Sequence, residues 1–448
     1  MDFLSFKNAC IAKAEQLGIT EYELYYQAGQ STSVEVFQHE ISEFSSANEG
    51  GVCFRCIVNG KMGYAATEEL SEEQAGAVVE KAMDNASVLE AEEQVFLGEG
   101  GKTYTKLDRE NYALPATEEL IAKALSAQQA LYDVPENTVD GCQTAAYAQS
   151  MQIAICNSKG LDLQYENNAA ILVSVAVVAG DQEMVNDYQI KVGKLDTIDH
   201  KALAEKAAKT AAGKLGGEVA PTGVYPVVFS PEAMSNLLST YSGVFSSEAA
   251  QKGLSKLSGK EGEVIASSAV TLIDDPFYKD NPMPIPFDAE GTPTACKKVI
   301  EEGKLNTLLY NLKTAAVAGK QTTGNAAKAG YAGAVGVRPF TMYLAAGEFT
   351  EEQLLEKAAN GVYINSLSGL HAGANPVTGD FSLQSAGFMI ENGKKTTPVK
   401  SFTVAGNFFE LLKKITAVGT NVELPSAMGM TAFGSPSVLV DNLSIAGK

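Results

Sequence analysis

The sequence has few residues that bind transition metals, and it contains no tryptophan. Among its 448 residues there are three histidines and six cysteines. The histidines, His39, His200 and His371, lie far apart, so none forms a pair at the spacing of about three to five residues found in zinc sites. The sequence therefore predicts no zinc site built on paired histidines.

Basic residues and long apolar runs are also scarce. The chain has 34 lysines and arginines against 54 aspartates and glutamates, a net charge of −20. Such a chain repels phosphate backbones, and no basic cluster overrides this, so we expect no nucleic-acid partner. The longest apolar run, 169–179 interrupted by Ser174, is far shorter than a membrane span of roughly 20 residues. The first residues lack a charged-then-apolar signal pattern, and we expect a cytoplasmic location without membrane contact.

Cys53 and Cys56 form a C-x-x-C pattern within an expected strand. Residues three apart on a strand point to opposite faces, so the two thiols are poorly placed to share a metal or a disulfide. Free, buried thiols are the preferred interpretation, and they fit a reducing compartment.

Helix and strand patterns divide the chain into three expected units. The first, 1–100, combines helices at 3–17 and 71–87 with strands at 22–27 and 33–43 and a hairpin at 51–65 that turns at Asn59-Gly60. The second, 110–220, has helices at 117–132, capped by Thr117, and 199–215, with strands at 140–149, 151–157, 161–168 and 170–179. The third, 224–448, is large and rich in glycine and strands. This order predicts an α+β fold.

The third unit opens with a strand and a helix of unusual composition. A short apolar run, 225–229, precedes Ser230 as expected N-cap and Pro231 at the first helical position. A zinc-peptidase helix needs two imidazoles beside a glutamate that serves as general base. Glu232 is such a glutamate, but Pro231 and Asn236 occupy the places where histidines would serve. The helix has the frame of a metal site without its ligands.

Further along, an apolar strand is expected at 264–273, and carboxylates follow it. Asp274 with Asp275, and Asp288 with Glu290, are candidates for acid–base work or for binding a hard cation, although adjacent carboxylates before a proline favour a turn. A hairpin at Asn392-Gly393 and a helix capped by Asn407 close the unit. Judged on its chemistry alone, the sequence presents no catalytic residues.

Short motifs of the third unit resemble the TldD/PmbA family, and within it the TldE (PmbA) branch. The matching segments are 287–293 (FDAEGTP), 321–325 (QTTGN), 378–382 (TGDFS), 387–393 (GFMIENG), 398–399 (PV), 403–407 (TVAGN), 434–440 (GSPSVLV) and 446–447 (AG). They follow one another in order over the whole unit. The 157–160 turn (NSKG) extends the resemblance more weakly to the first half.

The resemblance implies a cytosolic, heterodimeric peptidase with α+β domains. In the family, the TldD subunit carries zinc on an H-E-x-x-x-H helix, with a cysteine near the C-terminus as a further ligand. Residues 231–236 stand on that motif with the glutamate but neither histidine, and 421–434 contain no cysteine. The chain is thus similar to the zinc-free TldE partner. The family's older label as a DNA gyrase modulator finds no support in so acidic a chain.

Three functional hypotheses follow. The favoured one is a non-catalytic subunit that pairs with a TldD-like zinc subunit to process unfolded or leader peptides, with no cofactor on this chain and zinc on the partner. By family analogy, an extended peptide would lie in a cleft where glycine-rich loops allow close backbone approach: 321–336 and the loop holding Gly369, His371, Gly373, Gly379 and Asp380. The alternatives are a stand-alone homodimer that binds peptides without cleaving them, and a hydrolase that uses the 274–290 carboxylates with a borrowed metal.

Overall fold

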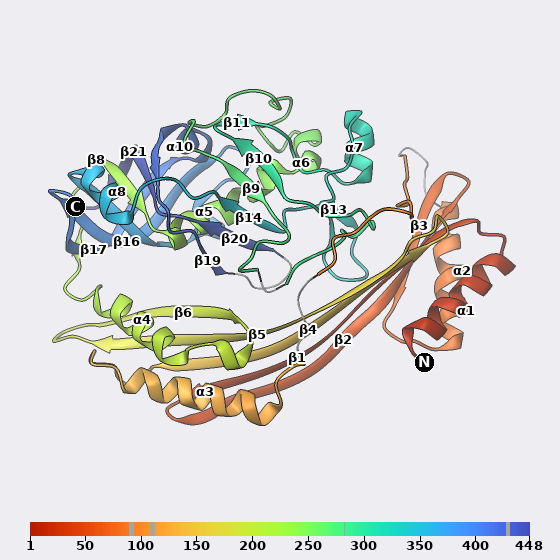
Figure 1. The fold of residues 1–448 in the computed structure, drawn as a ribbon, viewed down its shortest axis with the longest axis horizontal. Helices are drawn as coiled ribbons and strands as arrows, with labels where there is room; N and C mark the ends of the chain where they lie inside the picture. The colour runs from red at the N-terminus through yellow and green to blue at the C-terminus, as the bar shows by residue number, and fades with distance from the viewer. Residues whose placement is uncertain (89–93, 108–112, 282, 427–430) are drawn as a thin grey trace.

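The first half of the chain is built on one antiparallel sheet of six strands in the order β3-β2-β1-β4-β5-β6. In this computed structural model, residues 1–88, 94–107, 113–281, 283–426 and 431–448 are described. The strands are β1 (Glu21–Phe37), β2 (Glu40–Val58), β3 (Lys61–Thr67), β4 (Gln143–Asn157), β5 (Asp162–Ala179) and β6 (Met184–Gly193). The two expected N-terminal units therefore share a single sheet (Figure 1).

These strands are longer than the sequence predicted. The expected breaks between 27 and 33, at 150, and at 169 are wrong, because β1 pairs with β2 and β4 continuously through these polar stretches. Main-chain pairing does not need an apolar side chain at every second position. His39, expected in a strand, lies in the β1–β2 turn, where Gln38 and His39 both have positive φ.

Two pairs of helices cover opposite ends of one face of this sheet (Figure 1). At one end, α1 (Phe3–Gln16) and α2 (Glu72–Val88) bury a core with Phe6, Leu24 and Phe54. At the other end, α3 (Thr117–Tyr132) and α4 (His200–Ala212) pack on the strands. The expected cap by Thr117 is wrong: Thr117 is the first helical residue, and the Glu119 carboxylate accepts the Ala116 N–H.

The C-terminal domain contains a seven-stranded sheet in the order β18-β21-β8-β15-β16-β17-β7, in which β21 also pairs with β17. Five of its strands thereby close into a barrel. The bounds are β7 (Glu218–Val219), β8 (Gly223–Phe229), β15 (Gly361–Ser368), β16 (Asp380–Glu391), β17 (Lys394–Asn407), β18 (Ile415–Val418) and β21 (Val438–Ala446). The fold is α+β, as the sequence predicted.

A second C-terminal sheet has the order β11-β10-β9-β14-β20-β19, and β12 pairs with β13. These strands are β9 (Leu272–Asp274), β10 (Lys297–Glu301), β11 (Lys304–Leu305), β12 (Ala326–Lys328), β13 (Val335–Val337), β14 (Thr341–Leu344), β19 (Glu423–Ser426) and β20 (Ala432–Ser435). The helices are α5 (Pro231–Tyr241), α6 (Ser247–Gln251), α7 (Leu312–Ala318), α8 (Glu351–Ala358), α9 (Leu370–Gly373) and α10 (Phe408–Lys414). Two short 3₁₀ turns lie at Leu195–Thr197 and Ser242–Phe245.

The expected strand at 264–273 is wrong over most of its length, because only its last residues join β9. The N–H groups of Ile265 and Ala266 both donate to the Gly303 carbonyl, and Val264 is largely exposed, so the segment wraps the β10–β11 turn instead. In the described part of the chain, no helix is long and apolar enough to span a membrane.

The remaining face of the first sheet packs on the C-terminal domain. Tyr25, Ile153 and Tyr165 form one cluster with Ile285 and Phe287. Tyr165 meets Phe287 edge to face, with ring centroids 5.0 Å apart. The first residue of the 287–293 motif, Phe287, therefore lies in the contact between the C-terminal domain and the first sheet.

Candidate functional site

Helix α5 begins at Pro231, where the sequence predicted a helix that resembles a zinc-binding helix but lacks its histidines. The Ser230 hydroxyl accepts the Ala233 N–H at 3.1 Å, and Pro231 occupies the first turn, as expected. Met234, Leu237 and Tyr241 are buried in the domain core. The Tyr241 hydroxyl donates to the Asp380 carbonyl at 2.8 Å, which ties the far end of the helix to β16. The helix is thus fixed at both ends.

Glu232 lies on the first turn of α5, largely removed from water. Burial and, to a smaller extent, the neighbouring Asp187 raise the pKa of its carboxyl to about 7, while Lys206 and Lys214 act in the opposite direction. Asp187 belongs to β6 and Lys206 to α4, so Glu232 faces the first sheet and its helix. Its surroundings contain charges of both signs.

The side chains present on α5 do not fit a zinc ion. Proline has no donor atom at position 231, and the neutral amide of Asn236 is a poor substitute for an imidazole. Within the described ranges, no group of three or more histidine, cysteine, aspartate or glutamate side chains could hold a metal. His39 lies in a turn against the Tyr132 ring, His200 begins α4 as expected, and His371 is exposed in α9.

The predicted cleft residues lie at the N-cap of α9, within this helix and after it. Gly369 adopts a left-handed conformation (φ 76°) before the helix, and a Cβ at Gly373 would lie 2.4 Å from the Ser382 carbonyl oxygen. Gly379 has φ 82° and packs against Phe409. The Asp380 carboxylate accepts the Asn407 amide at 2.8 Å, a bond that lowers its pKa together with one from Thr378. The glycines here allow close backbone approach within the domain itself.

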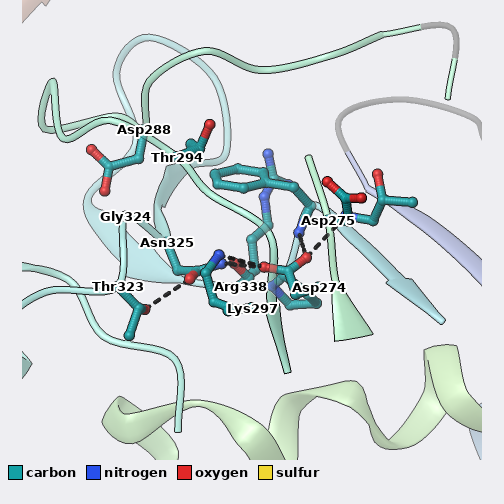
Figure 2. A network of polar contacts seen from close by, with 12 residues as sticks. Asp274, Asp275, Asp288, Thr294, Lys297, Thr323, Gly324, Asn325 and Arg338 are labelled. Carbon is teal, nitrogen blue, oxygen red and sulfur yellow. Dashed lines mark hydrogen bonds and ion pairs between the residues drawn. The ribbon is translucent and has the colours of Figure 1, made fainter. Parts of the chain in front are cut away.

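Asp274 lies at the centre of a buried polar network (Figure 2). Its side chain is 0% exposed. One oxygen accepts the backbone N–H groups of Phe340 (2.8 Å) and Thr341 (3.0 Å). The other accepts the Asn325 amide at 2.8 Å and the Lys297 ammonium at 3.1 Å. Because all four donors come from the protein, Asp274 holds β9, β10, β14 and the 323–325 loop together and is not free to activate water.

The other candidate carboxylates are engaged in a similar way. Asp288 accepts three backbone N–H groups, those of Glu290, Thr292 and Ala326, each at 2.9 Å. Glu290 accepts the Leu312 N–H at 2.8 Å, and Asp275 accepts the Phe277 N–H at 3.0 Å. Burial raises the pKa of both Asp288 and Glu290. The Asp275 bond to Phe277 is a local turn contact, the interpretation that the sequence favoured for Asp274-Asp275, and Asp288 binds its own turn through Glu290 and Thr292.

Sequence reasoning missed a buried ion pair on the first sheet. Arg55 on β2 meets Glu23 on β1, with Nη2 2.6 Å from the carboxylate, and their side chains are 5% and 1% exposed. Burial works against the arginine charge, but Glu23 and Glu290 raise its pKa. Since Glu290 belongs to the 287–293 loop, the pair lies at the contact between the two halves. The two residues are 32 positions apart, and only the β1–β2 register places them opposite each other.

Comparison with known protein families finds matches along most of the chain. Three models of the PmbA/TldA metallopeptidases match the chain: domain 1 over residues 22–86, the central domain over 111–215 and the C-terminal domain over 222–447. The chain belongs to the PmbA/TldD metallopeptidase family.

Individual relatives cover nearly the whole chain. A metalloprotease of Methanothermobacter thermautotrophicus is 28% identical over 93% of both chains. The crystal structure of a Thermotoga maritima protein, described as a modulator of a DNA gyrase, is 30% identical, with a TM-score of 0.90 over 99% of this chain and 100% of that one. TldE from Thermococcus kodakarensis shares the fold at 24% identity, with a TM-score of 0.89 over 98% and 99% of the two chains.

Proposed function

We propose that this chain is the zinc-free, TldE-like subunit of a two-chain metallopeptidase that acts on unfolded or leader peptides in the cytoplasm. The observation that carries the proposal is the donor set of α5, where Glu232 stands between Pro231 and Asn236. The chain keeps the domains of a metallopeptidase family over nearly its full length. A chain that has the family's domains but lacks the zinc-binding side chains is best explained as the partner of a subunit that carries them.

The state of the other acids supports a non-catalytic role. A hydrolase using Asp274, Asp288 or Glu290 would need a carboxylate free to bind water or a metal. Each of these three accepts hydrogen bonds from protein groups in the interior. On this proposal the catalytic zinc and its general base belong to a TldD-like partner, and this chain helps to hold the extended peptide.

The test is to co-express this chain with a zinc-bearing homologue from the same cell and to measure assembly and metal content. We expect a 1:1 complex with about one zinc per pair, and close to none on the chain alone after zinc loading and desalting. Peptide cleavage by the complex should survive Glu232→Gln here and be lost when the partner's motif glutamate becomes glutamine.

Two outcomes would overturn this function. About one zinc bound per isolated chain would place a metal site here after all. A stable homodimer that ignores the zinc-bearing homologue yet binds peptides without cleaving them would favour the stand-alone peptide-binding alternative.

A further inference from the structure

The outer edge of β2 is open over most of its length. Strand β3 pairs with β2 only from Val52 to Val58, so in the described part of the chain no strand pairs with the outer side of β2 between Glu40 and Gly51. This stretch contains neither lysine nor proline, two residues that often protect an exposed edge. Its unused main-chain N–H and C=O groups are therefore available to another strand.

One face of this stretch is apolar beside the turn that joins β1 to β2. Val34 and Val36 of β1 are buried in the core that α3 covers. Their cross-strand partners, Phe44 and Ile41, therefore point to the same face of the sheet. Phe44 and Ile41 are nevertheless 50% and 44% exposed. They form an apolar patch next to the open edge.

The opposite face of the same stretch is acidic. Glu35 of β1 pairs with Glu43, and strand alternation places Glu49 on the same face as Glu43. Glu40 pairs with Phe37, two residues along β1 from Glu35, so Glu40 also lies on this face. Among the described residues, no cationic side chain forms an ion pair with Glu40, Glu43 or Glu49. Like charges opposite each other destabilise a sheet, so a cation beside Glu35 and Glu43 would relieve their repulsion.

We propose that the open edge of β2, from Glu40 to Gly51, is the surface that pairs with the zinc-bearing partner subunit. A strand of that subunit extends the first sheet, with lysine or arginine against the acidic face and apolar side chains against Ile41 and Phe44. The partner strand therefore alternates basic and apolar residues. This inference rests on the proposed function and specifies where the two chains meet.

The charges argue against a second copy of this chain as the occupant. Two copies related by a twofold axis would pair these edges antiparallel, and paired residues point to the same face. The two acidic faces would then join, which brings Glu40, Glu43 and Glu49 of both copies onto one surface without a counter-charge. A different chain of the same family avoids this conflict. The family model of domain 1 spans β1 to β3, so such a chain should have an equivalent edge without needing the same charges.

The experiment measures amide hydrogen exchange of the full-length chain, alone and in complex with the zinc-bearing homologue from the same cell. We expect amides within 40–51 to exchange at least about tenfold more slowly in the complex, because their outward N–H groups become hydrogen-bonded. Strand β6, the edge at the other side of the sheet, is the internal reference and should exchange at the same rate in both samples.

Two matched charge variants separate the edge from the overall charge. The first replaces the three β2 glutamates of the acidic face by glutamine, and should weaken the complex about tenfold and make its affinity less dependent on salt. The second makes the same change at three exposed glutamates of the C-terminal domain: Glu302→Gln, Glu348→Gln and Glu391→Gln. It removes the same charge and should weaken the complex less than about twofold.

A second pair of variants tests the apolar patch. Ile41→Thr together with Phe44→Thr keeps residues that favour strands but removes the apolar contact, and should weaken the complex about tenfold. Val264→Thr together with Val317→Thr, at exposed positions outside the first sheet, is the control and should weaken it less than about twofold.

The outcomes separate this inference from the proposed function. A complex that leaves 40–51 unprotected, or that both charge variants weaken equally, would overturn the edge assignment and leave the proposed function standing. If an alternating lysine–valine decapeptide then protects 40–51, the edge binds peptides instead. A dimer of the isolated chain that protects 40–51 would identify a second copy as the occupant and make the proposal wrong. If the homologue does not bind at all, the proposed function and this inference both fail.

Discussion

Two acidic residues of the C-terminal domain, Asp274 and Glu232, are both shielded from water, but their hydrogen-bond partners differ. Asp274 is completely buried and accepts hydrogen bonds from two backbone N–H groups, an amide and an ammonium. Glu232 is less buried and lies among Asp187, Lys206 and Lys214, and its pKa is raised to about 7. Donors that match a carboxylate fix its charge, whereas burial without them makes the charge costly.

The contrast teaches which acids hold the fold together. Asp274 and Asp288 join separate strands and loops through the consecutive residues Asn325 and Ala326. Among the described residues, no hydrogen bond or ion pair of the Glu232 carboxylate links separate elements in this way, although the resemblance places it where a catalytic glutamate would stand. On this view Asp274 stabilises the fold whereas the buried charge of Glu232 costs stability, and three substitutions test that contrast.

The largest expected effect is that of Asp274→Ala. It leaves the Lys297 ammonium, only 13% exposed, without its partner and frees three further buried donors. Breaking a buried pair in this way costs about 3–5 kcal/mol. We expect a large fall in the midpoint of urea denaturation and faster hydrogen exchange at the Phe340 and Thr341 amides.

The neighbouring substitution Asp275→Asn is the control. The Asp275 carboxylate accepts the Phe277 N–H and contacts the Cys296 thiol, and asparagine can still accept from both, so the change should stay below about 1 kcal/mol. If both variants lose the same stability, the network around Asp274 does not have the role assigned to it.

A smaller effect, with the opposite sign, is expected for Glu232→Gln. The folded pKa of about 7 lies above the ordinary value of 4.5, so the folded state holds the proton more tightly. As pH rises from about 4.5 to 7, the unfolded state ionises first and folding loses up to about 3 kcal/mol. Glutamine removes this penalty, so the variant should be more stable than the parent at about pH 8 and nearly equal to it at about pH 4.5.

Urea midpoints at the two pH values check this prediction. Glu391→Gln, an exposed change on β16, should alter the free energy of unfolding by no more than about 0.5 kcal/mol at either pH. An equal gain in stability from Glu232→Gln at both pH values would show that the gain does not come from ionisation of the carboxyl. The contrast with Asp274 would then be lost.

Local signals made part of this structure predictable from the sequence. The Ser230-Pro231 start of α5 and the Asn59-Gly60 and Asn392-Gly393 turns were correct because each depends on neighbouring residues. The Glu23–Arg55 pair was missed because it depends on strand register. Strand β6 was missed because it is a largely polar edge strand. Strand β1 was split because its polar middle lies between the two helix-packed cores of the sheet, where no helix needs an apolar partner.

The candidate site also combines features that the sequence alone shows with features that depend on the fold. The absence of imidazoles at 231 and 236 is a property of the sequence alone, and so is the glutamate between them. Whether Asp274, Asp288 and Glu290 are free or engaged depends on loops and strands up to 67 residues away, so the sequence could name these acids without assigning their partners.

The smallest expected effect is that of Ser230→Ala, which tests whether α5 is held as firmly as the network of Asp274. The Ser230 hydroxyl is the N-cap of the helix and satisfies the Ala233 N–H inside the domain. Losing an N-cap of this kind costs about 1 kcal/mol. The urea midpoint should fall accordingly, while Ser239→Ala on the exposed side of the same helix should change stability by less than about 0.5 kcal/mol. A loss as large as that of Asp274→Ala would mean that the helix start supports more of the domain than its own first turn. A loss no larger than that of the Ser239 control would mean that packing of Met234, Leu237 and Tyr241 fixes the helix without its cap.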